Sequence, residues 1–572
     1  MVESQSCFEI KNVGANLKKE HKVFNLIYLI EIFAEFHPEF FRKKSKRGKP
    51  IKYYPKELLT YIFWGLNNNK ESYRELEDWC DNNDESCQLV LNCKNPGKDV
   101  INRFKNNNTD IINAFDQFLI DLASAIGLVD GKIVYADGTV LKAWCNTFKK
   151  MYPDEIQYLK KFMRKNVKNK KLWNKLQKYY ATDESNEELK KELKPIIDKL
   201  DYNLNINGIH LLKLSLISSR NFEKVLERIE LMEENIDGEN SISIIDPESR
   251  HILDKKGNMG LNYNYQTVTD KKYGFRLAHY ITNAPNDKKE AKKLVDLTTE
   301  KLHTDEFTIC FDNGYWDEDL LKQIYKGNTR VVIPYKTDVT RNKQKYKNKN
   351  KSGKRQEMEK QKNTSKKNKP KRIQKHEFTY IGEKDAYECP KTKELLEMVG
   401  IVTLSGSKKK KYTTDYCLKC EFKNECTSQY RRIIYDPYDP IIEKIRQLYY
   451  SQEGQEIYYL RGHFAETSFA LLLEIRNHRG IKTKGLEKVN NEMTLQEIHH
   501  NIKKYEKHTT NSFLKYLLKY IKKYKKQYGK INFTSLEEIR EKLIIENDII
   551  KGIRNGKKDT SRKKNKTFQS KL

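Results

Sequence analysis

Three short segments, far apart in the chain, each hold an acidic residue of a kind that binds metal ions. Asp137 lies in the segment YADGT, Asp312 in FDNGY and Glu466 in RGHFAE. Two strand-end carboxylates and a helical glutamate can hold a pair of hard divalent cations. Such a pair binds both the attacking and the leaving oxygen of a phosphodiester. The three acids therefore predict metal-dependent chemistry on a nucleic acid.

The residues around the two aspartates predict how they are positioned. An apolar run, 132–136 or 307–311, precedes each aspartate, and a turn containing glycine is expected to follow. This pattern places both carboxylates at the C-terminal ends of buried strands, where an open sheet presents its ligands. Glu466 lies in a segment that is expected to continue as a helix. Asp246 and Asp270 also flank strands, but Asp137 and Asp312 lie on the first and fourth predicted strands, which are expected to lie side by side. Spacing alone leaves Glu456 and Glu474 open as rivals of Glu466.

The composition of the chain agrees with a nucleic-acid partner. Lys and Arg number 110 against 79 Asp and Glu, which gives a net charge of +31. A surface this basic binds polyanions through counterion release, without reading their sequence. AT-rich coding, which favours Lys, Asn, Ile and Tyr, also accounts for part of this excess.

Hydropathy and the N-terminal residues indicate a cytoplasmic protein that does not enter a membrane. No apolar run approaches the roughly 18 residues of a membrane span, and the longest covers 58–66. The first residues lack the basic-then-apolar layout of a signal peptide. The ten cysteines are therefore expected in a reducing compartment, where clustered thiols indicate metal binding before disulfides.

The N-terminal part of the chain, residues 20–125, is predicted to be a helical DNA-binding domain. Apolar spacing predicts helices near 24–33, 55–66, 72–79 and 98–105. Short helices ending in a basic helix, which carries Arg103, are typical of a helix-turn-helix-like domain. An ordinary helical bundle fits the periodicity equally well.

The following region, 130–335, predicts the first part of an α/β catalytic core with a mixed sheet. Strand patterns at 241–246, 261–269 and 274–282 include a hairpin closed by 270–273. Helix 287–303, strand 307–311, helix 318–326 and strand 329–334 follow, and a lysine- and glutamate-rich helical insertion occupies 150–235. This order, completed by the glutamate helix within 440–505, is that of a ribonuclease-H-like sheet with flanking helices.

The core is interrupted by a basic segment and a cysteine-rich segment. Residues 336–385 are predicted to be disordered, since 341–375 hold sixteen Lys or Arg and almost no apolar residue. In 386–430, Cys417-x-x-Cys420 is followed by Cys426 and preceded by Cys389. Four such thiolates suit a closed structural Zn²⁺ site, and ordinary reduced cysteines are the alternative. Residues 506–572 are predicted to form a basic helical tail, and His499 and His500 to be structural.

These motifs together resemble the DDE transposases of bacterial insertion sequences. The N-terminal helices and the cysteine set are also similar to those of this family, so that the resemblance covers most of 20–505. The segments that carry it are ADGT at 136–139, the hairpin end at 282–287, DNGY at 312–315, and the run from Glu466 through 485–489 to 500–501.

The resemblance implies a role for each matching residue. Asp137, Asp312 and Glu466 would bind two Mg²⁺ ions, with Mn²⁺ as a substitute. Arg461 would contact phosphate at the transposon end, beside Tyr458. A basic residue usual in the family about two turns past the glutamate is replaced by Leu473, and Arg476 lies at helical spacing to substitute for it.

The resemblance also implies the partners and the reaction. The protein would bind the element's terminal inverted repeats and target DNA, function as a homodimer on DNA, and reside in the bacterial cytoplasm with the nucleoid. It would nick the element's end and direct the freed 3′-hydroxyl at target DNA. Two other functions fit the same residues: a non-catalytic DNA-binding regulator derived from a transposase, and a ribonuclease-H-like nuclease that does not join DNA.

Overall fold

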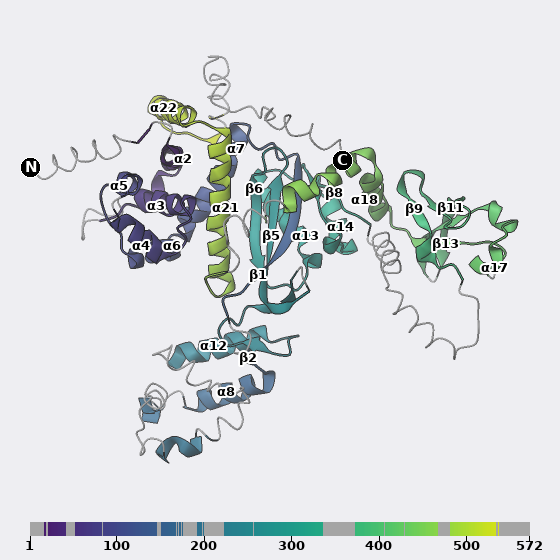
Figure 1. The fold of residues 1–572 in the computed structure, drawn as a ribbon, viewed down its shortest axis with the longest axis horizontal. Coiled ribbons are helices and arrows are strands. Elements are labelled where there is room, and N and C mark those ends of the chain that lie inside the picture. The colour runs from purple at the N-terminus through teal and green to yellow at the C-terminus, as the bar shows by residue number, and fades with distance from the viewer. Residues whose placement is uncertain are drawn as a thin grey trace, which may run out of the picture.

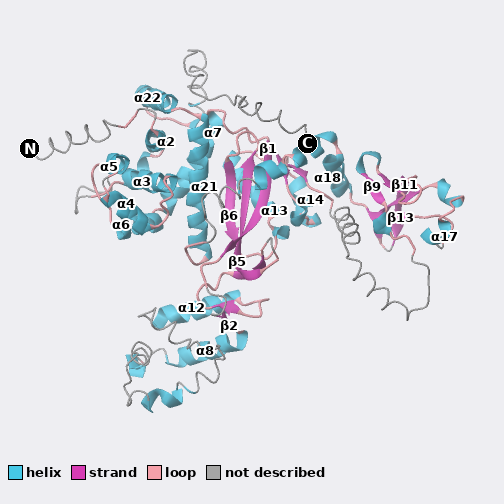
Figure 2. Ribbon diagram, viewed as in Figure 1, coloured by secondary structure: helices cyan, strands magenta, loops and turns pink. Residues whose placement is uncertain are grey.

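A mixed six-stranded sheet lies at the centre of the molecule (Figures 1 and 2). The computed structural model describes residues 17–18, 21–41, 52–82, 84–145, 150–166, 169, 171–172, 174–175, 191–196, 198, 222–254, 257–335, 372–404, 406–427, 429–466, 469, 481–533 and 536. The strands of the sheet are β1 (Ile133–Lys142), β4 (Arg250–Leu253), β5 (Met259–Asp270), β6 (Arg276–Thr282), β7 (Thr308–Cys310) and β8 (Arg330–Val332).

The order of the strands is β4-β5-β1-β7-β8, with β6 also paired to β5. Strand β5 is antiparallel to β1, β4 and β6, whereas β1, β7 and β8 run parallel to one another. Ten consecutive residues of β5, 261–270, are buried. A strand buried along its whole length is covered on both faces, as in sheets flanked by helices. The chain therefore folds as a mixed α/β protein.

The helices that pack around this sheet come from distant parts of the chain. Helix α13 (Ala291–Leu302) contacts β5 and β6, and α14 (Glu318–Tyr325) contacts β8. From beyond residue 430, α18 (Pro440–Tyr450) and α19 (Gln452–Tyr459) also pack on β8. The short 3₁₀ turns η2 (Asp287–Lys289) and η3 (Asn313–Tyr315) follow β6 and β7 and contact each other.

Most strands and helices of this region lie where the sequence predicts them. The hairpin β5–β6, the helices α13 and α14, and the strands β7 and β8 are confirmed. The predicted strand at 241–246 is wrong in extent, because β3 (Ile242–Ser243) has two residues and pairs with β2 (Lys150–Met151) outside the central sheet.

The prediction that Asp137 ends a strand is also wrong. Strand β1 continues through Asp137 to Lys142, because its antiparallel hydrogen bonds to β5 extend from Val134 to Lys142. Only the parallel pairing with β7 stops before the acid, at Tyr135. Asp137 therefore lies inside β1, paired with β5 on one side, at a position where the pairing of β1 with β7 on the other side has ended.

Helices fill the N-terminal part of the chain, as predicted, and two of them begin with recognisable capping residues. Pro55 occupies the first turn of α3, and Ser72 with Glu75 forms a capping box at the start of α4. The helices are α2 (Lys22–Phe36), α3 (Pro55–Asn67), α4 (Tyr73–Asp81), α5 (Glu85–Leu91), α6 (Lys98–Asn107) and α7 (Thr109–Ala125), with the short η1 (Pro38–Phe40) after α2.

Helix α21 (Leu486–His508) connects these N-terminal helices to the sheet (Figure 1). It packs against α3 and α7 on one side and against β6 on the other, and the Tyr505 hydroxyl donates to the Leu119 carbonyl at 2.5 Å. His500, predicted to be structural, is buried and bonded to the Gly274 carbonyl at 2.9 Å. One continuous hydrophobic core joins the N-terminal helices, the central sheet and α22 (Asn511–Tyr528), which packs on α2.

Two smaller units project from the central sheet (Figure 1). The first contains α8 (Pro153–Asn166), α12 (Phe222–Asn235) and the β2–β3 pair around a core of its own. The second is a five-stranded antiparallel sheet in the order β13-β12-β11-β10-β9, also with its own core. Its strands and short helices are β9 (Thr379–Ile381), β10 (Ala386–Glu388), β11 (Leu395–Leu404), β12 (Ser407–Thr413), β13 (Ile434–Pro437), η4 (Lys375–Glu377), η5 (Gly382–Lys384), η6 (Asp415–Leu418) and α17 (Lys423–Cys426).

The predicted basic segment falls mostly outside the described residues, because 336–371 belong to the part that the structure does not describe. Most of the predicted C-terminal tail, past residue 536, lies outside it as well. Within the described part of the chain, no helix combines the length and the apolar character needed to cross a lipid bilayer.

Candidate active site

The carboxylates of Asp137 and Asp312 lie at the same edge of the central sheet because β1 and β7 are neighbours. The parallel register pairs Tyr135 with Cys310, so each acid stands two residues beyond the last paired position of its strand. Asp137 is buried at 5% exposure, whereas the side chain of Asp312 is 37% exposed. One Asp312 oxygen accepts the Gly314 N–H at 2.8 Å and so begins η3.

Arg461 brings a positive charge to both acids. Its guanidinium donates to Asp137 Oδ1 at 2.8 Å and lies 3.7 Å from Asp312 Oδ2. Burial disfavours the charged form, but Asp137 and Asp312 outweigh this effect and raise the pKa of Arg461. The sequence suggested contact with DNA phosphate for Arg461. In the structure its charge faces the two acids, and the predicted contact with DNA stays a prediction.

A fourth acid, Asp287, lies beside this pair. Its Oδ1 accepts from the side-chain amides of Asn264 at 2.7 Å and Gln266 at 2.5 Å, both on β5. A Cβ atom added at Gly138 would lie 2.8 Å from Asp287 Oδ1, and one added at Gly314 would lie 3.6 Å from its Oδ2. The two glycines that follow the predicted catalytic acids thus leave room for the Asp287 carboxylate.

Tyr315 is a buried neighbour of these carboxylates. It is fully buried, and its hydroxyl donates to the Gln266 side-chain oxygen. Burial raises the pKa of Tyr315 most, and the negative charges of Asp287, Asp137 and Asp312 raise it further. Sequence reasoning assigned no role to Asp287 or Tyr315. The only signal was their place in the hairpin end and in the DNGY motif.

Glu466 ends the π-helix η7 (Gly462–Glu466), which contacts β1 and β5. Phe464, within the same turn, stacks on Tyr135 of β1 with ring centroids 5.2 Å apart. The backbone of the third predicted acid therefore belongs to a segment that packs on the strand carrying Asp137.

The predicted DNA-binding residues are spread over different parts of the molecule. Tyr458, on α19, is half-buried against Tyr449 of α18, and burial raises the pKa of Tyr458 to about 12. Arg103 is exposed on α6 and donates to the Asp99 carbonyl at 3.2 Å. Three further positions lie outside the described residues: Leu473, Glu474 and Arg476.

The rival acids have other partners. Buried Asp246 accepts the Tyr263 hydroxyl at 2.8 Å. Asp270 accepts the Lys272 N–H at 2.9 Å and caps the turn between β5 and β6. Glu456 is exposed on α19, bonded to its neighbour Gln452 at 2.9 Å. None of these three acids is bonded to Arg461 in the described part of the chain.

The four cysteines proposed as zinc ligands line one cavity in the second projecting unit. Burial raises the pKa of the Cys426 thiol, Arg432 opposes this shift, and Cys389, Cys417 and Cys420 add to it. The four thiols thus line the same cavity and lie close enough to affect one another's ionisation. Among the described residues, however, no group of three or more His, Cys, Asp or Glu side chains converges closely enough to hold a metal ion.

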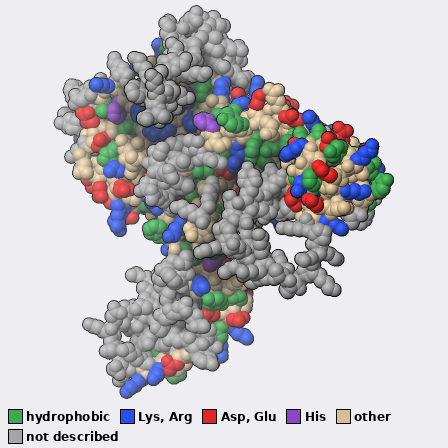
Figure 3. Space-filling model, turned by 45° about the vertical axis from the view of Figure 1, so that its right-hand side comes forward, with side chains coloured by type: hydrophobic (Ala, Val, Ile, Leu, Met, Phe, Trp, Pro, Cys, Tyr) green, Lys and Arg blue, Asp and Glu red, His purple; other side chains and the backbone are tan. Residues whose placement is uncertain are grey.

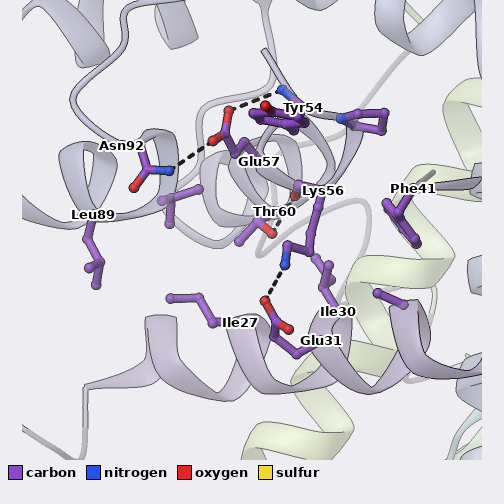
Figure 4. Close-up of a pocket in the computed structure, with 13 residues that line it drawn as sticks. Ile27, Ile30, Glu31, Phe41, Tyr54, Lys56, Glu57, Thr60, Leu89 and Asn92 are labelled. Carbon is purple, nitrogen blue, oxygen red and sulfur yellow. Dashed lines mark hydrogen bonds and ion pairs between the residues drawn. The ribbon is translucent and has the colours of Figure 1, made fainter. Parts of the chain in front are cut away.

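Another cavity lies among the N-terminal helices and has a different character (Figure 4). Ile27, Ile30 and Leu89 supply apolar walls, and Lys56 reaches across to pair with Glu31. It adjoins none of the predicted site residues. We therefore place the candidate active site at the Asp137–Asp312 edge of the sheet.

Comparison with known proteins adds one decisive match. Residues 388–506 match the family model described as a transposase DDE domain. Within this stretch lie Arg461, Glu466 and the four cysteines. This stretch of the chain is therefore similar to a transposase DDE domain. The match points to transposase function, and this family acts on DNA with divalent metal ions. Neither the curated proteins nor the solved structures contain a significant match.

The matched segment also explains how the DDE domain is assembled. It runs from the end of β10 through α18, α19 and η7 to the last turn of α21. Asp137 and Asp312 precede it in the chain, yet Arg461 from within the segment contacts both. The DDE segment and the central sheet are therefore joined at the acid pair.

Proposed function

We propose that this chain is the transposase of a bacterial insertion sequence, which cuts DNA at the element's ends and joins it to target DNA. One observation carries the proposal. Two acids 175 positions apart in the numbering, on neighbouring strands, share the guanidinium of Arg461, a residue of the matched DDE segment. This arrangement creates a site where two carboxylates converge on one positive charge.

The donor set fits the divalent metal ions that this family uses. Asp137 and Asp312 offer carboxylate oxygens, the ligands that Mg²⁺ prefers, and the contact of both acids with the Arg461 guanidinium supports a site that attracts positive charge. We propose Glu466 as the third ligand, since η7 packs on β1. Two Mg²⁺ or Mn²⁺ ions, when bound, would neutralise the charge on the phosphate and activate water.

Hydrogen bonds from β5 hold the Asp287 carboxylate beside Asp137 and Asp312. Asn264 and Gln266 orient the Asp287 carboxylate, and Gln266 in turn accepts the Tyr315 hydroxyl. Hydrogen bonds of this kind fix the positions of ligating carboxylates and are part of the design of metal sites. We therefore assign Asp287 a positioning role beside the strand that carries Asp137 and the turn that begins at Asp312.

The finer fold assignment is part of the proposal. The antiparallel strands β1, β5 and β6 are followed by β7 and β8, which run parallel to β1, and β4 is an additional strand paired to β5. This order, with helices between the strands, supports a ribonuclease-H-like core in 130–335 and 440–505. Six helices in the described part of 20–125 support a helix-turn-helix-like DNA-binding domain. The partners would be the terminal inverted repeats and target DNA, bound by a homodimer at the nucleoid.

DNA contacts would involve Arg461 at the acid pair together with residues elsewhere in the chain. We propose that Arg461 moves from the acids to a DNA phosphate when metal ions bind, and that Tyr458, Arg103 and Arg476 contribute to the same interface. Arginine suits this exchange, because its planar guanidinium pairs equally well with carboxylate and phosphate.

A zinc site at Cys389, Cys417, Cys420 and Cys426 is a separate proposal. It is supported by the four thiols lining one cavity and by the short Cys417-x-x-Cys420 spacing. Two of the ligands belong to the short elements η6 and α17, so small backbone shifts would bring the sulfurs together.

Cleavage of a labelled DNA duplex that carries the element's own end tests the function. Wild type is compared with Asp312→Asn, and with Glu456→Gln as a control acid outside the site. We expect cleavage in Mg²⁺ by wild type and by the control, and none by Asp312→Asn although it still binds the duplex.

The other outcomes identify the alternatives. Binding without cleavage by wild type, in Mg²⁺ and in Mn²⁺, would establish a DNA-binding regulator and overturn the enzymatic proposal. Cleavage without any joined product, when target DNA is supplied, would establish a nuclease.

A further inference from the structure

Helix α22 has a composition that separates it from other surface helices of this chain. Its eighteen residues include six lysines and neither Asp nor Glu. Its inner face is occupied by buried residues such as Leu514, Leu517 and Ile521, which belong to the main hydrophobic core. The helix is thus fixed to the body of the protein, and all the charged side chains that α22 carries are positive.

The lysines of α22 form an ordered row. Lys515, Lys519 and Lys523 are spaced four residues apart and are all exposed, with Lys526 continuing the row. Residues four apart lie on the same face of a helix. At 1.5 Å per residue, the row from Lys515 to Lys526 extends over about 16 Å.

Tyrosines flank this row at the same spacing. Tyr516, Tyr520, Tyr524 and Tyr528 are also four residues apart. Their rings pack in pairs, with centroids 5.0 Å apart for Tyr516–Tyr520 and 4.5 Å apart for Tyr524–Tyr528. Aromatic rings with hydroxyl groups beside lysines can supply both hydrogen bonds and charge to phosphates.

The four lysines of this row have no acidic partners among the described ion pairs, whereas basic residues of α8 do. On α8, Lys160 pairs with Glu233 and Arg164 with Glu230 of α12. On α22, Lys525 and Lys522 contact the α2 acids Glu35 and Glu31. Among the ion pairs of the described residues, none involves the four lysines of the row, Lys515, Lys519, Lys523 and Lys526.

The β9–β13 unit offers a comparison in which charge is mixed. Figure 3 shows acidic and basic side chains intermingled over the unit that contains β9–β13. A purely basic face spanning about 16 Å is therefore a local feature of α22, not a consequence of the high net charge alone.

We propose that the polar face of α22 binds the phosphate backbone of duplex DNA. The inference takes only its ligand, DNA, from the proposed function and does not require the catalytic site. An anionic membrane is disfavoured, because a helix that binds a membrane surface inserts its apolar face, and that face of α22 is buried in the core. Lysines spaced along one line suit a backbone with regularly repeated phosphates.

The salt dependence of DNA binding tests this proposal. The affinity for a labelled duplex of arbitrary sequence is measured between 50 and 200 mM salt, roughly the range in which counterion release dominates. The variant is the triple substitution Lys515→Gln, Lys519→Gln, Lys523→Gln. The control triple, Lys161→Gln, Lys165→Gln, Lys194→Gln, removes three exposed lysines from the unit that contains α8, far from α22 in Figure 1.

Each lost phosphate contact lowers the slope of log K against log salt by about 0.9, so the α22 triple should lower it by about 2 to 3. Its affinity at 50 mM salt should fall by about tenfold or more, while the control matches wild type. Thermal unfolding and circular dichroism of each variant establish that it is folded.

Three results would overturn the proposal. The α22 triple could bind like wild type, the control triple could lose as much as the α22 triple, or the α22 lysines could be needed for binding anionic vesicles and not for duplex DNA. Asp312→Asn, measured alongside, separates this proposal from the function above. If the α22 triple binds DNA like wild type, the α22 proposal fails while wild type can still cleave DNA. If wild type does not cleave, the proposed function fails while the salt slopes still test α22.

Discussion

The central sheet and the cysteine-bearing sheet both bring together side chains that can bind metals, but only the central sheet holds its side chains close enough to contact one shared partner, Arg461. In the central sheet, β1 is hydrogen-bonded on both sides, to β5 and β7, and Asp137 and Asp312 both contact Arg461. In the β9–β13 unit, Cys417 and Cys426 lie on four-residue helices, and the sulfurs line a cavity without converging.

The difference shows what positions a metal site before a metal arrives. Strand register fixes two acids through many backbone hydrogen bonds, whereas short helices and turns leave the ligands free to shift. A structural zinc site is often formed only when the metal binds, because metal binding and folding are coupled. We therefore expect the acid pair to persist without metal and the cysteine site to depend on it.

The largest effect should come from removing a thiol. We expect purified protein to contain one zinc ion per chain, and Cys420→Ser to lose it and to destabilise the β9–β13 unit by several kcal/mol, since metal binding contributes directly to folding. Metal analysis and thermal unfolding measure both. Cys93→Ser, at an exposed cysteine outside the cavity, is the control. Zinc-free wild type with the same stability as Cys420→Ser would leave the cysteines as ordinary thiols.

A smaller effect should come from Asp270, an acid of the central sheet that lies outside the site. Burial, with a contribution from Asp130, raises the pKa of Asp270 to about 7, above the unfolded value of about 3.9. The folded state therefore holds the proton longer, and stability should fall as pH rises from about 4 to about 7, by on the order of 2–4 kcal/mol.

Denaturant unfolding of Asp270→Asn and wild type at several pH values tests this expectation. The variant should lack most of the decline, while Glu306→Gln, at an exposed acid, should retain it. A wild type whose stability does not fall over this range would contradict the assignment, because it would place the folded pKa near its ordinary value.

Gly138→Ala should disturb the acid pair itself. The new Cβ would lie 2.5 Å from Gln266 Nε2 and 2.8 Å from Asp287 Oδ1, so at least one side chain must move. We expect a loss of about 1–3 kcal/mol in the free energy of unfolding, together with reduced cleavage. Gly327→Ala, where the nearest atoms are 3.4 Å or more away, is the matched control. Equal behaviour of the two variants would remove the packing argument for Asp287.

The smallest effect concerns the charge balance of the site. Replacing Arg461 by Gln removes the cation between the two acids, so we expect Mn²⁺ to bind about tenfold more tightly, equivalent to roughly 1.4 kcal/mol. Free Mn²⁺ can be quantified by electron paramagnetic resonance, independently of activity. Arg330→Gln, which breaks an exposed pair with Glu453, serves as the control. Unchanged or weaker Mn²⁺ binding would mean that Arg461 does not compete with metal ions.

Local patterns in the sequence were sufficient for much of the fold. Alternation and turn residues predicted the β5–β6 hairpin, and apolar spacing predicted α3 and α4. The order of these elements also led to the expectation that the strands of Asp137 and Asp312 are adjacent, which the β1–β7 pairing confirms. Such features depend on neighbours within a few residues, where propensity and periodicity operate.

Long-range contacts decided the rest. The length of β1 depends on pairing with β5, and the orientation of Arg461 depends on acids more than a hundred residues away. Asp287 is held at the site by hydrogen bonds from Asn264 and Gln266 of β5. The sequence by itself therefore determined which acids, glycines and helices the protein has. Only the tertiary structure decided which of them meet, because strand register and the packing of distant segments are not encoded in local spacing.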